Sequence, residues 1–127
     1  VRELHGSVLR NYCMNCGMSY SADEVLTLHA LDDDGIPRCP ACAGIVKPDV
    51  VLYEEPLDER VLRASIEAIA QAGMLVVAGT SLAVYPAAGL IDYFRGSHLV
   101  IINRSPTPRD RQADLCIAAN VGDVFDF

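Results

Sequence analysis

The chain has 127 residues, 51% of them hydrophobic and 21% charged, and a formal net charge of -7. This length suits one ordinary domain with its own core, and the composition argues against a disordered tail. A broad nucleic-acid-binding surface needs clustered positive charge, so no nucleic acid partner is expected. No apolar run of about 18 residues and no signal-like start is present, so we expect no membrane partner and a cytoplasmic location.

The first candidate functional residue is His5, which is followed by Gly6. An imidazole exchanges a proton readily near neutral pH, which suits a general base. A lone histidine is nevertheless more often a structural residue than a base. From the residues alone, both interpretations of His5 remain open.

Two Cys-x-x-Cys pairs, separated by 22 residues, come next in the chain. Each such turn can direct two thiolates at one ion, and four thiolates form the closed tetrahedron that is typical of structural zinc. A redox-active pair or structural disulfides are the competing interpretations. The odd total of five cysteines favours metal binding in a reducing compartment. The expected zinc ligands are Cys13, Cys16, Cys39 and Cys42. Cys116, in an apolar run, is expected to be a small buried residue.

Residues 13–47 show little sustained hydrophobic periodicity and are rich in turn formers. Beyond them, apolar residues recur at helical spacing over 58–72, and a second helix is expected over 86–95. Strand-like runs occupy 50–53, 74–80, 98–103 and 114–118, and the run that begins at Met74 is apolar enough for burial on both faces. Alternation of strands and helices at short spacing predicts an α/β fold with a parallel sheet.

The predicted sheet has too few crossover helices to cover both of its faces and edges. Exposed sheet edges are avoided in isolated proteins, so another segment or a partner is expected to cover them. Self-association through the exposed edge is a further expectation.

Polar residues follow two of the predicted strands. Gly79, Thr80 and Ser81 end one strand, and Asn103 ends the next. Ligands of open parallel sheets bind beyond the carboxyl ends of the strands, where glycine permits close approach and hydroxyl groups can bind phosphate or ribose. The alternatives are an ordinary turn at residues 79–81 and a capping role for Asn103. The two strand ends together favour a nucleotide site.

In combination and in this order, the motifs resemble those of the sirtuins, which are NAD-dependent protein-lysine deacylases. The matching stretches are ELHGS (3–7), the two cysteine pairs, KPDVVLYEE (47–55), AGTSLAVYPAA (78–88), IINRS (101–105), and ADLCI with NVGDV (113–124). The resemblance therefore extends over essentially the whole chain.

The resemblance implies a role for each matching position. His5 corresponds to the general base that takes a proton from the nicotinamide ribose after the acyl-lysine oxygen has displaced nicotinamide. The products would be lysine, nicotinamide and an O-acyl-ADP-ribose. The residues that match the adenosine side of NAD are Gly79, Thr80, Ser81, Asn103, Arg104, Ser105 and Val121. Those that match the strand-forming substrate-peptide segment are Val50, Val51, Leu52, Tyr53, Glu54 and Glu55.

Two departures from the sirtuin pattern are present. Glu54 occupies a position that is often glycine in the family, and the 127 residues contain neither a GAGxS turn nor a TQNID stretch. The chain is therefore expected to be the C-terminal part of a bacterial-type sirtuin, inactive alone. Residues 1–12 and 48–127 would form a partial Rossmann-like NAD-binding domain, and residues 13–47 an inserted zinc-ribbon module.

Two other functions remain open at this stage. A zinc-ribbon module that binds another protein would account for the cysteines but not for the polar strand ends. An NAD-dependent ADP-ribosyltransferase would account for a nucleotide site but would give a different product.

Overall fold

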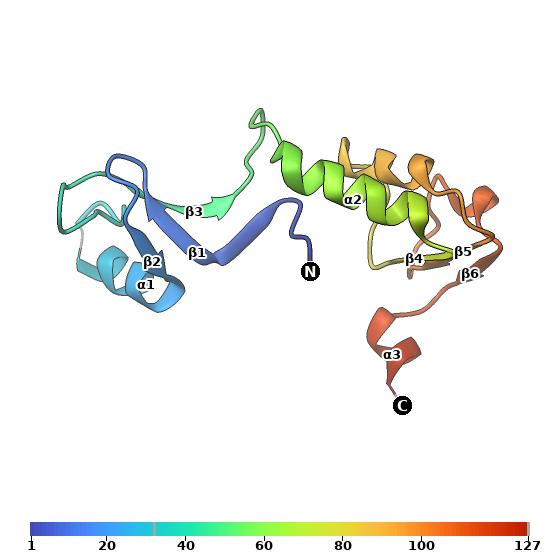
Figure 1. Ribbon diagram of the computed structural model, residues 1–127. Helices are drawn as coiled ribbons and strands as arrows, with labels where there is room; N and C mark the ends of the chain where they lie inside the picture. Colours follow the sequence, from blue (N-terminus) through green and yellow to red (C-terminus); the bar gives the residue numbers. More distant parts are fainter. Residues whose placement is uncertain (32, 127) are drawn as a thin grey trace. The chain divides into compact units, whose positions relative to one another are not determined.

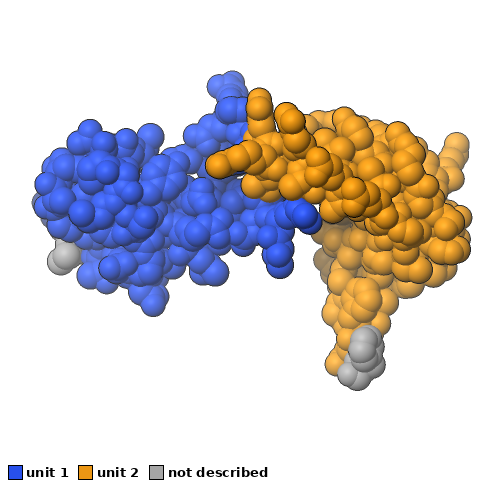
Figure 2. All heavy atoms as spheres, in the orientation of Figure 1, with its two compact units in different colours: residues 1–58 blue, residues 59–127 orange. Residues whose placement is uncertain are grey.

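The computed structural model describes residues 1–31 and 33–126 (Figure 1). The chain divides into two compact units, Val1–Asp58 and Glu59–Phe127 (Figure 2). Each unit has its own sheet and its own buried cluster. The predicted α/β class with a parallel sheet is confirmed. The predicted assignment of residues 1–12 and 48–127 to one domain stays a prediction.

The first unit contains an antiparallel sheet with the strand order β2-β1-β3. Its strands are β1 (Gly6–Cys13), β2 (Ser19–Ser21) and β3 (Val46–Val50). The expected strand at 50–53 is wrong beyond Val50, because residues 51–53 lie outside the strands. The reason is that β1 offers partners to β3 only from Cys13 back to Gly6, which pairs with Val50.

Helix α1 (Ala22–Leu31) follows β2 directly, although the periodicity of residues 13–47 does not predict it. Its start is fixed by a reciprocal capping arrangement. The backbone N–H and hydroxyl of Ser21 donate to the Glu24 carboxylate at 2.7 and 2.8 Å, and the Glu24 N–H donates to the Ser21 hydroxyl at 3.3 Å. Helix and sheet enclose a small core of Cys13, Cys39 and Val46.

The second unit contains the parallel sheet β4-β5-β6. Its strands, β4 (Met74–Ala78), β5 (His98–Ile102) and β6 (Leu115–Ile117), coincide with three of the predicted runs. The remaining elements are α2 (Glu59–Gln71), the 3₁₀ helices η1 (Ala87–Tyr93) and η2 (Asp110–Gln112), and α3 (Val121–Phe125).

Two sequence-based expectations for the second unit need correction. The helix expected over 86–95 is a 3₁₀ helix, η1, with a tighter turn than an α-helix, which suits a short connection. Strand β4 is not buried on both faces, since Met74 and Val76 are exposed. The core of Leu82, Ile91, Leu99 and Ile101 covers one face of the sheet. Among the described residues, no helix has the length and apolar composition to cross a membrane.

Candidate functional site

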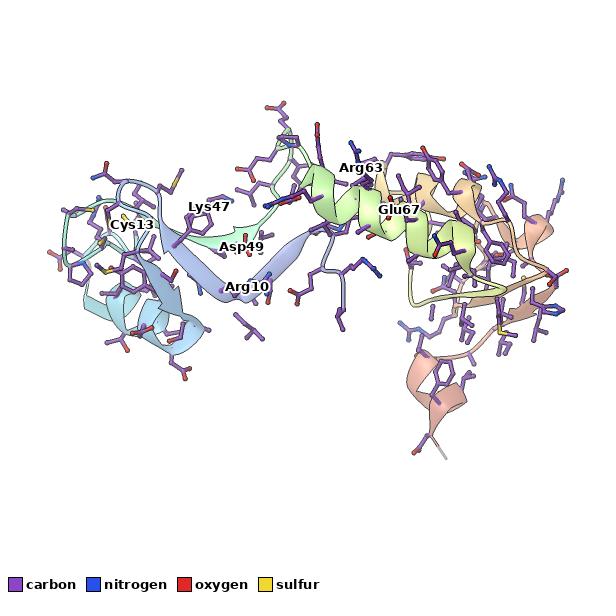
Figure 3. All side chains as sticks on the ribbon, in the orientation of Figure 1. Arg10, Cys13, Lys47, Asp49, Arg63 and Glu67 are labelled. Atoms are coloured by element: carbon purple, nitrogen blue, oxygen red, sulfur yellow. The ribbon has the colours of Figure 1, made fainter. Side chains whose placement is uncertain are left out.

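The four predicted zinc ligands lie together in the first unit. Their sulfur atoms are all within 4.8 Å of one another, and gather near the labelled Cys13 in Figure 3. The Cys13–Cys42 and Cys16–Cys39 sulfur distances are 3.4 and 3.7 Å. Tetrahedral zinc with bonds of about 2.3 Å to sulfur requires sulfur–sulfur distances of about 3.8 Å. The four sulfur atoms are therefore spaced as zinc ligands would be. None of the five cysteines forms a disulfide bond among the described residues.

Each cysteine pair lies on a tight, hydrogen-bonded turn. The Cys13 carbonyl accepts the N–H of Gly17 at 2.9 Å, and the Cys39 carbonyl accepts the N–H of Ala43 at 2.8 Å. The two turns approach closely at Gly44, where an added Cβ would lie 2.9 Å from the Cys13 sulfur. A larger residue there would push the turns apart, so Gly44 permits the convergence of the four thiols.

Hydrogen-bond donors and the neighbouring thiols shift the pKa values of the clustered cysteines. The Tyr20 hydroxyl donates to the Cys39 sulfur at 3.0 Å, and this bond, together with the N–H groups of Ala41 and Cys42, lowers the pKa of Cys39 to about 6. At Cys16, the N–H of Met18 lowers the pKa, but the surrounding thiols outweigh it and raise the pKa to about 12. Four ionised thiols at this spacing repel one another unless a cation lies between them, which is what zinc supplies.

The His5-Gly6 pair is held against the end of β3. The N–H of Val51 donates to the His5 carbonyl at 3.1 Å, while the His5 side chain is exposed. Gly6 has a φ of +76°, and an added Cβ would lie 1.9 Å from the Asp49 carbonyl oxygen. Only glycine fits at this close approach of β1 to β3. The glycine therefore sets the backbone position from which His5 projects.

The predicted substrate-peptide segment, residues 50–55, begins at the end of β3 and continues into a turn. The N–H of Glu55 donates to the Leu52 carbonyl at 3.1 Å and closes this turn. Glu54 has a φ of +69°, which is the left-handed conformation that glycine adopts freely. Glu54 therefore adopts a backbone conformation that a glycine at this position would favour.

In the second unit, the parallel register places three of the predicted NAD-binding residues close together. Ala78 pairs with Ile102, and Ile102 with Ile117, so β4, β5 and β6 end at the same edge. Gly79 donates its N–H to the Ile102 carbonyl at 3.0 Å. The Cβ position of Gly79 lies 3.4 Å from a methyl carbon of Val121. Asn103 continues β5 at this edge and donates its N–H to the Ile117 carbonyl at 3.1 Å.

The other predicted NAD-binding residues follow these strand ends. Thr80 and Ser81 are exposed, and the Thr80 hydroxyl accepts the N–H of Leu82 at 3.2 Å. The Asn103 side chain donates to the Ser105 carbonyl at 2.8 Å and so shapes its own loop. A small cavity of about 100 Å³ is lined by Asn103, Arg104, Ser105 and Cys116, among others. Cys116 is exposed, contrary to expectation, because this face of β6 is uncovered in the described chain.

Three residues that support these sites were not predicted from the sequence. Tyr20 and Gly44 contact the cysteine cluster, and Lys47 donates to the segment at residues 50–55. A tyrosine four positions after Cys16 and a glycine two positions after Cys42 are regular spacings, but spacing alone does not show a side-chain contact.

Curated relatives match almost the whole chain. The family profile described as "Sir2 family" matches residues 1–86. An NAD-dependent protein deacetylase of Clostridium perfringens is 56% identical over 126 residues, which are 98% of this chain and 50% of that protein. One of Clostridium acetobutylicum is 52% identical over 126 residues, 99% of this chain and 50% of that protein. The chain thus spans about half the length of the curated relatives it matches.

Solved structures agree with this relationship. A Sir2 structure with a p53 peptide and NAD+ matches with a TM-score of 0.87 and 36% identity, over 98% of this chain and 52% of that one. A structure of Sir2Tm bound to a propionylated peptide gives the same values. The profile match covers more than half of the 127 residues. The chain therefore belongs to the Sir2 family.

Proposed function

We propose that the chain forms part of the active site of an NAD-dependent protein-lysine deacetylase, with His5 as the general base and residues 50–55 as the peptide-binding segment. Its relatives from two Clostridium species carry the name NAD-dependent protein deacetylase. Solved relatives hold acetylated or propionylated peptides and NAD+. These matches support acyl-lysine peptides and NAD as the substrates.

One observation carries the proposal. The bond from the Val51 N–H to the His5 carbonyl joins the candidate base to the candidate peptide segment. A peptide that adds as a strand at Val50 and Val51, before the turn at residues 52–55, would lie close to His5. A general base must be within hydrogen-bond reach of its proton, and an exposed imidazole at this position is available for that role.

The edge of the parallel sheet is the proposed site of the adenosine part of NAD. Gly79 leaves its backbone open to a ligand, while Thr80, Ser81 and Asn103 supply hydroxyl and amide groups. Arg104, Ser105 and Val121 complete the proposed set. This placement agrees with the general location of ligands in open parallel sheets.

The proposed reaction needs a proton acceptor but no metal. Attack of the acyl oxygen on the nicotinamide ribose breaks the bond to nicotinamide, and His5 takes a ribose hydroxyl proton as the acyl group moves to the sugar. Water then releases lysine, which leaves O-acyl-ADP-ribose. The four proposed zinc ligands, Cys13, Cys16, Cys39 and Cys42, leave no coordination position open, so zinc has a structural role.

The same proposal includes the domain division and the location. Residues 1–12 and 48–127 are assigned to one Rossmann-like domain, and residues 13–47 to the zinc module, which contains all four clustered cysteines. The proposal of a cytoplasmic location rests on the cysteine pattern of the sequence, two zinc-type pairs and one further cysteine, which is typical of a reducing compartment.

Product analysis of the complete protein that carries this chain tests the function. With an acetyl-lysine peptide and NAD, we expect equal amounts of free lysine peptide, nicotinamide and O-acetyl-ADP-ribose by mass spectrometry. Transfer of ADP-ribose to the peptide, with the acetyl group retained, would instead support an ADP-ribosyltransferase. Absence of both products, with zinc bound and the fold intact, would favour a protein-interaction module.

The 127 residues alone should show no turnover in the same assay. They contain neither a GAGxS turn for the phosphates nor a TQNID stretch for nicotinamide. Release of nicotinamide by these residues alone would show that the two motifs are not needed.

A further inference from the structure

The peptide segment ends in a turn, residues 52–55, that places a residue other than glycine in an unfavourable backbone conformation. The N–H of Glu55 bonds to the Leu52 carbonyl, and Glu54, the third residue of the turn, has a φ of +69°. For a residue with a Cβ, the left-handed conformation is unfavourable. A glycine at position 54 would avoid this strain. Because the residue is glutamate, other interactions must hold the turn closed.

Burial of apolar side chains does not supply them. Leu52 and Tyr53 expose 53% and 99% of their surface in the described chain. Side chains that remain this exposed gain little from the hydrophobic effect. Polar interactions must therefore account for the closed turn.

Glu55 closes the turn a second time through its side chain. One carboxylate oxygen, Oε2, accepts the N–H of Leu52 at 2.8 Å. The backbone of Glu55 therefore bonds to the Leu52 carbonyl, and its side chain bonds to the Leu52 N–H. The same oxygen also accepts the ammonium group of Lys47 at 3.2 Å.

Lys47 connects the two ends of the segment. Its side chain, which starts on β3 and is labelled in Figure 3, is only 12% exposed. The Nζ atom donates to the Val50 carbonyl at 2.8 Å, at the start of the segment, and to Glu55 at its end. A largely buried ammonium group is costly unless it is paired, so Lys47 is held in this position by both partners.

We propose that Lys47 and Glu55 are positioning residues that hold residues 50–55 in the conformation that receives the acyl-lysine peptide. This inference rests on the proposed function of the segment. We call the Lys47–Glu55 pair the clamp. Val50 and Val51, at the start of the segment, are bonded to Gly6 and His5. The clamp fixes the other end of the segment, at Glu55.

Steady-state kinetics of the complete protein test the inference. Lys47→Met removes the ammonium group and keeps most of the side-chain length. We expect the KM for an acetyl-lysine peptide to rise at least about tenfold, because the two hydrogen bonds that the ammonium group donates to Val50 and Glu55 are lost. The KM for NAD and the zinc content should stay unchanged. Lys47→Arg, which keeps the charge, should restore most of the peptide affinity.

Arg10→Met is the matched control. Arg10 lies on β1 and is exposed, and its side-chain partners, Glu3 and Asp49 of β3, both lie outside residues 50–55. Its substitution should leave the peptide KM unchanged. An unchanged peptide KM in Lys47→Met, or an equal rise in Arg10→Met, would overturn the inference.

Amide hydrogen exchange keeps the clamp testable if the protein shows no deacetylation or if Lys47→Met does not fold. In the zinc-loaded chain, we expect faster exchange at the Leu52 and Glu55 amides in Lys47→Met, and in Glu55→Gln as the second variant. Faster exchange without turnover would support the clamp while the proposed function fails. Unchanged exchange at both amides would overturn the clamp.

Discussion

Glycine at position 6 illustrates how a single residue sets the position of the proposed base. The chain adopts φ values of +76° at Gly6 and +74° at Gly17, but only Gly6 lies against another strand. At Gly17 an added Cβ would meet nothing within 4 Å. Substitution of Gly17 should therefore cost backbone strain alone, whereas substitution of Gly6 should cost backbone strain and a steric clash.

Gly6→Ala should destabilise the first unit more than Gly17→Ala. Backbone strain alone should cost Gly17→Ala about 1 kcal/mol. At Gly6, the clash with the Asp49 carbonyl adds to the strain, and we expect about 3 kcal/mol or more in total. Urea unfolding of the zinc-loaded chain measures both values. Equal losses of stability in the two variants would show that β1 and β3 separate easily.

The residue scale also shows what could be predicted from sequence and what could not. The four cysteines were predictable because zinc imposes a simple spacing on its ligands. The conformation of Glu54 was not, because a glutamate in the left-handed region is stabilised by Lys47 and Glu55 through bonds that no local pattern encodes.

At the scale of elements, the parallel strands of the second unit and helix α2 were easier to predict than the strands β1 and β2 and the shorter helices. The apolar runs at β4 and β5 identify the parallel strands, although only β5 contains buried residues. Helix α1 has only weak periodicity, but the Ser21-Ala22-Asp23-Glu24 stretch is a capping pattern that could have located its start. The pattern over 86–95 indicates a helix but does not distinguish the 3₁₀ geometry of η1 from that of an α-helix.

The capping of α1 gives a prediction with a defined pH dependence. Bonds from the Ser21 N–H and hydroxyl lower the pKa of Glu24 below its ordinary value of 4.5. A carboxylate with a lowered pKa stabilises the fold fully above its unfolded pKa and loses this contribution only as the pH falls through the folded value. Ser21→Ala should therefore cost about 1 kcal/mol, equally at pH 6 and pH 8.

Urea unfolding of the zinc-loaded chain at these two pH values measures that cost. Asn120→Ala is a control at the start of α3, where the side chain bonds to the exposed Asp123 carboxylate at 3.1 Å but to no backbone N–H, so less stability should be lost. A Ser21→Ala penalty that grows between pH 6 and pH 8 would mean that a group other than Glu24 controls the capping.

At the scale of the whole molecule, the two units have cores of different origin. Cys13 and Cys39 are two of the three buried residues in the first core, so zinc and the core share residues there. The second core consists of Leu82, Ile91, Leu99 and Ile101, and contains no cysteine. The stability of the first unit should therefore depend on the metal, and that of the second should not.

Removal of zinc by a chelator tests this difference by hydrogen exchange. We expect the amides of β1 and β3 to lose protection, since the ion supplies much of the folding energy of such a module. The amides of Leu99 and Ile101 in β5 should keep theirs. Loss of protection in both units together would mean that the second core is not independent of the metal.

The proposed base is the central claim, and one substitution tests it most directly. His5 is exposed, and its carbonyl, not its side chain, holds Val51, so His5→Tyr should leave the fold intact. In the complete protein, single-turnover deacetylation of an acetyl-lysine peptide with NAD should fall at least about 100-fold, the usual contribution of a general base. Zinc content and peptide binding should remain. Turnover equal to that of the unsubstituted protein would contradict the assignment of His5 as the base.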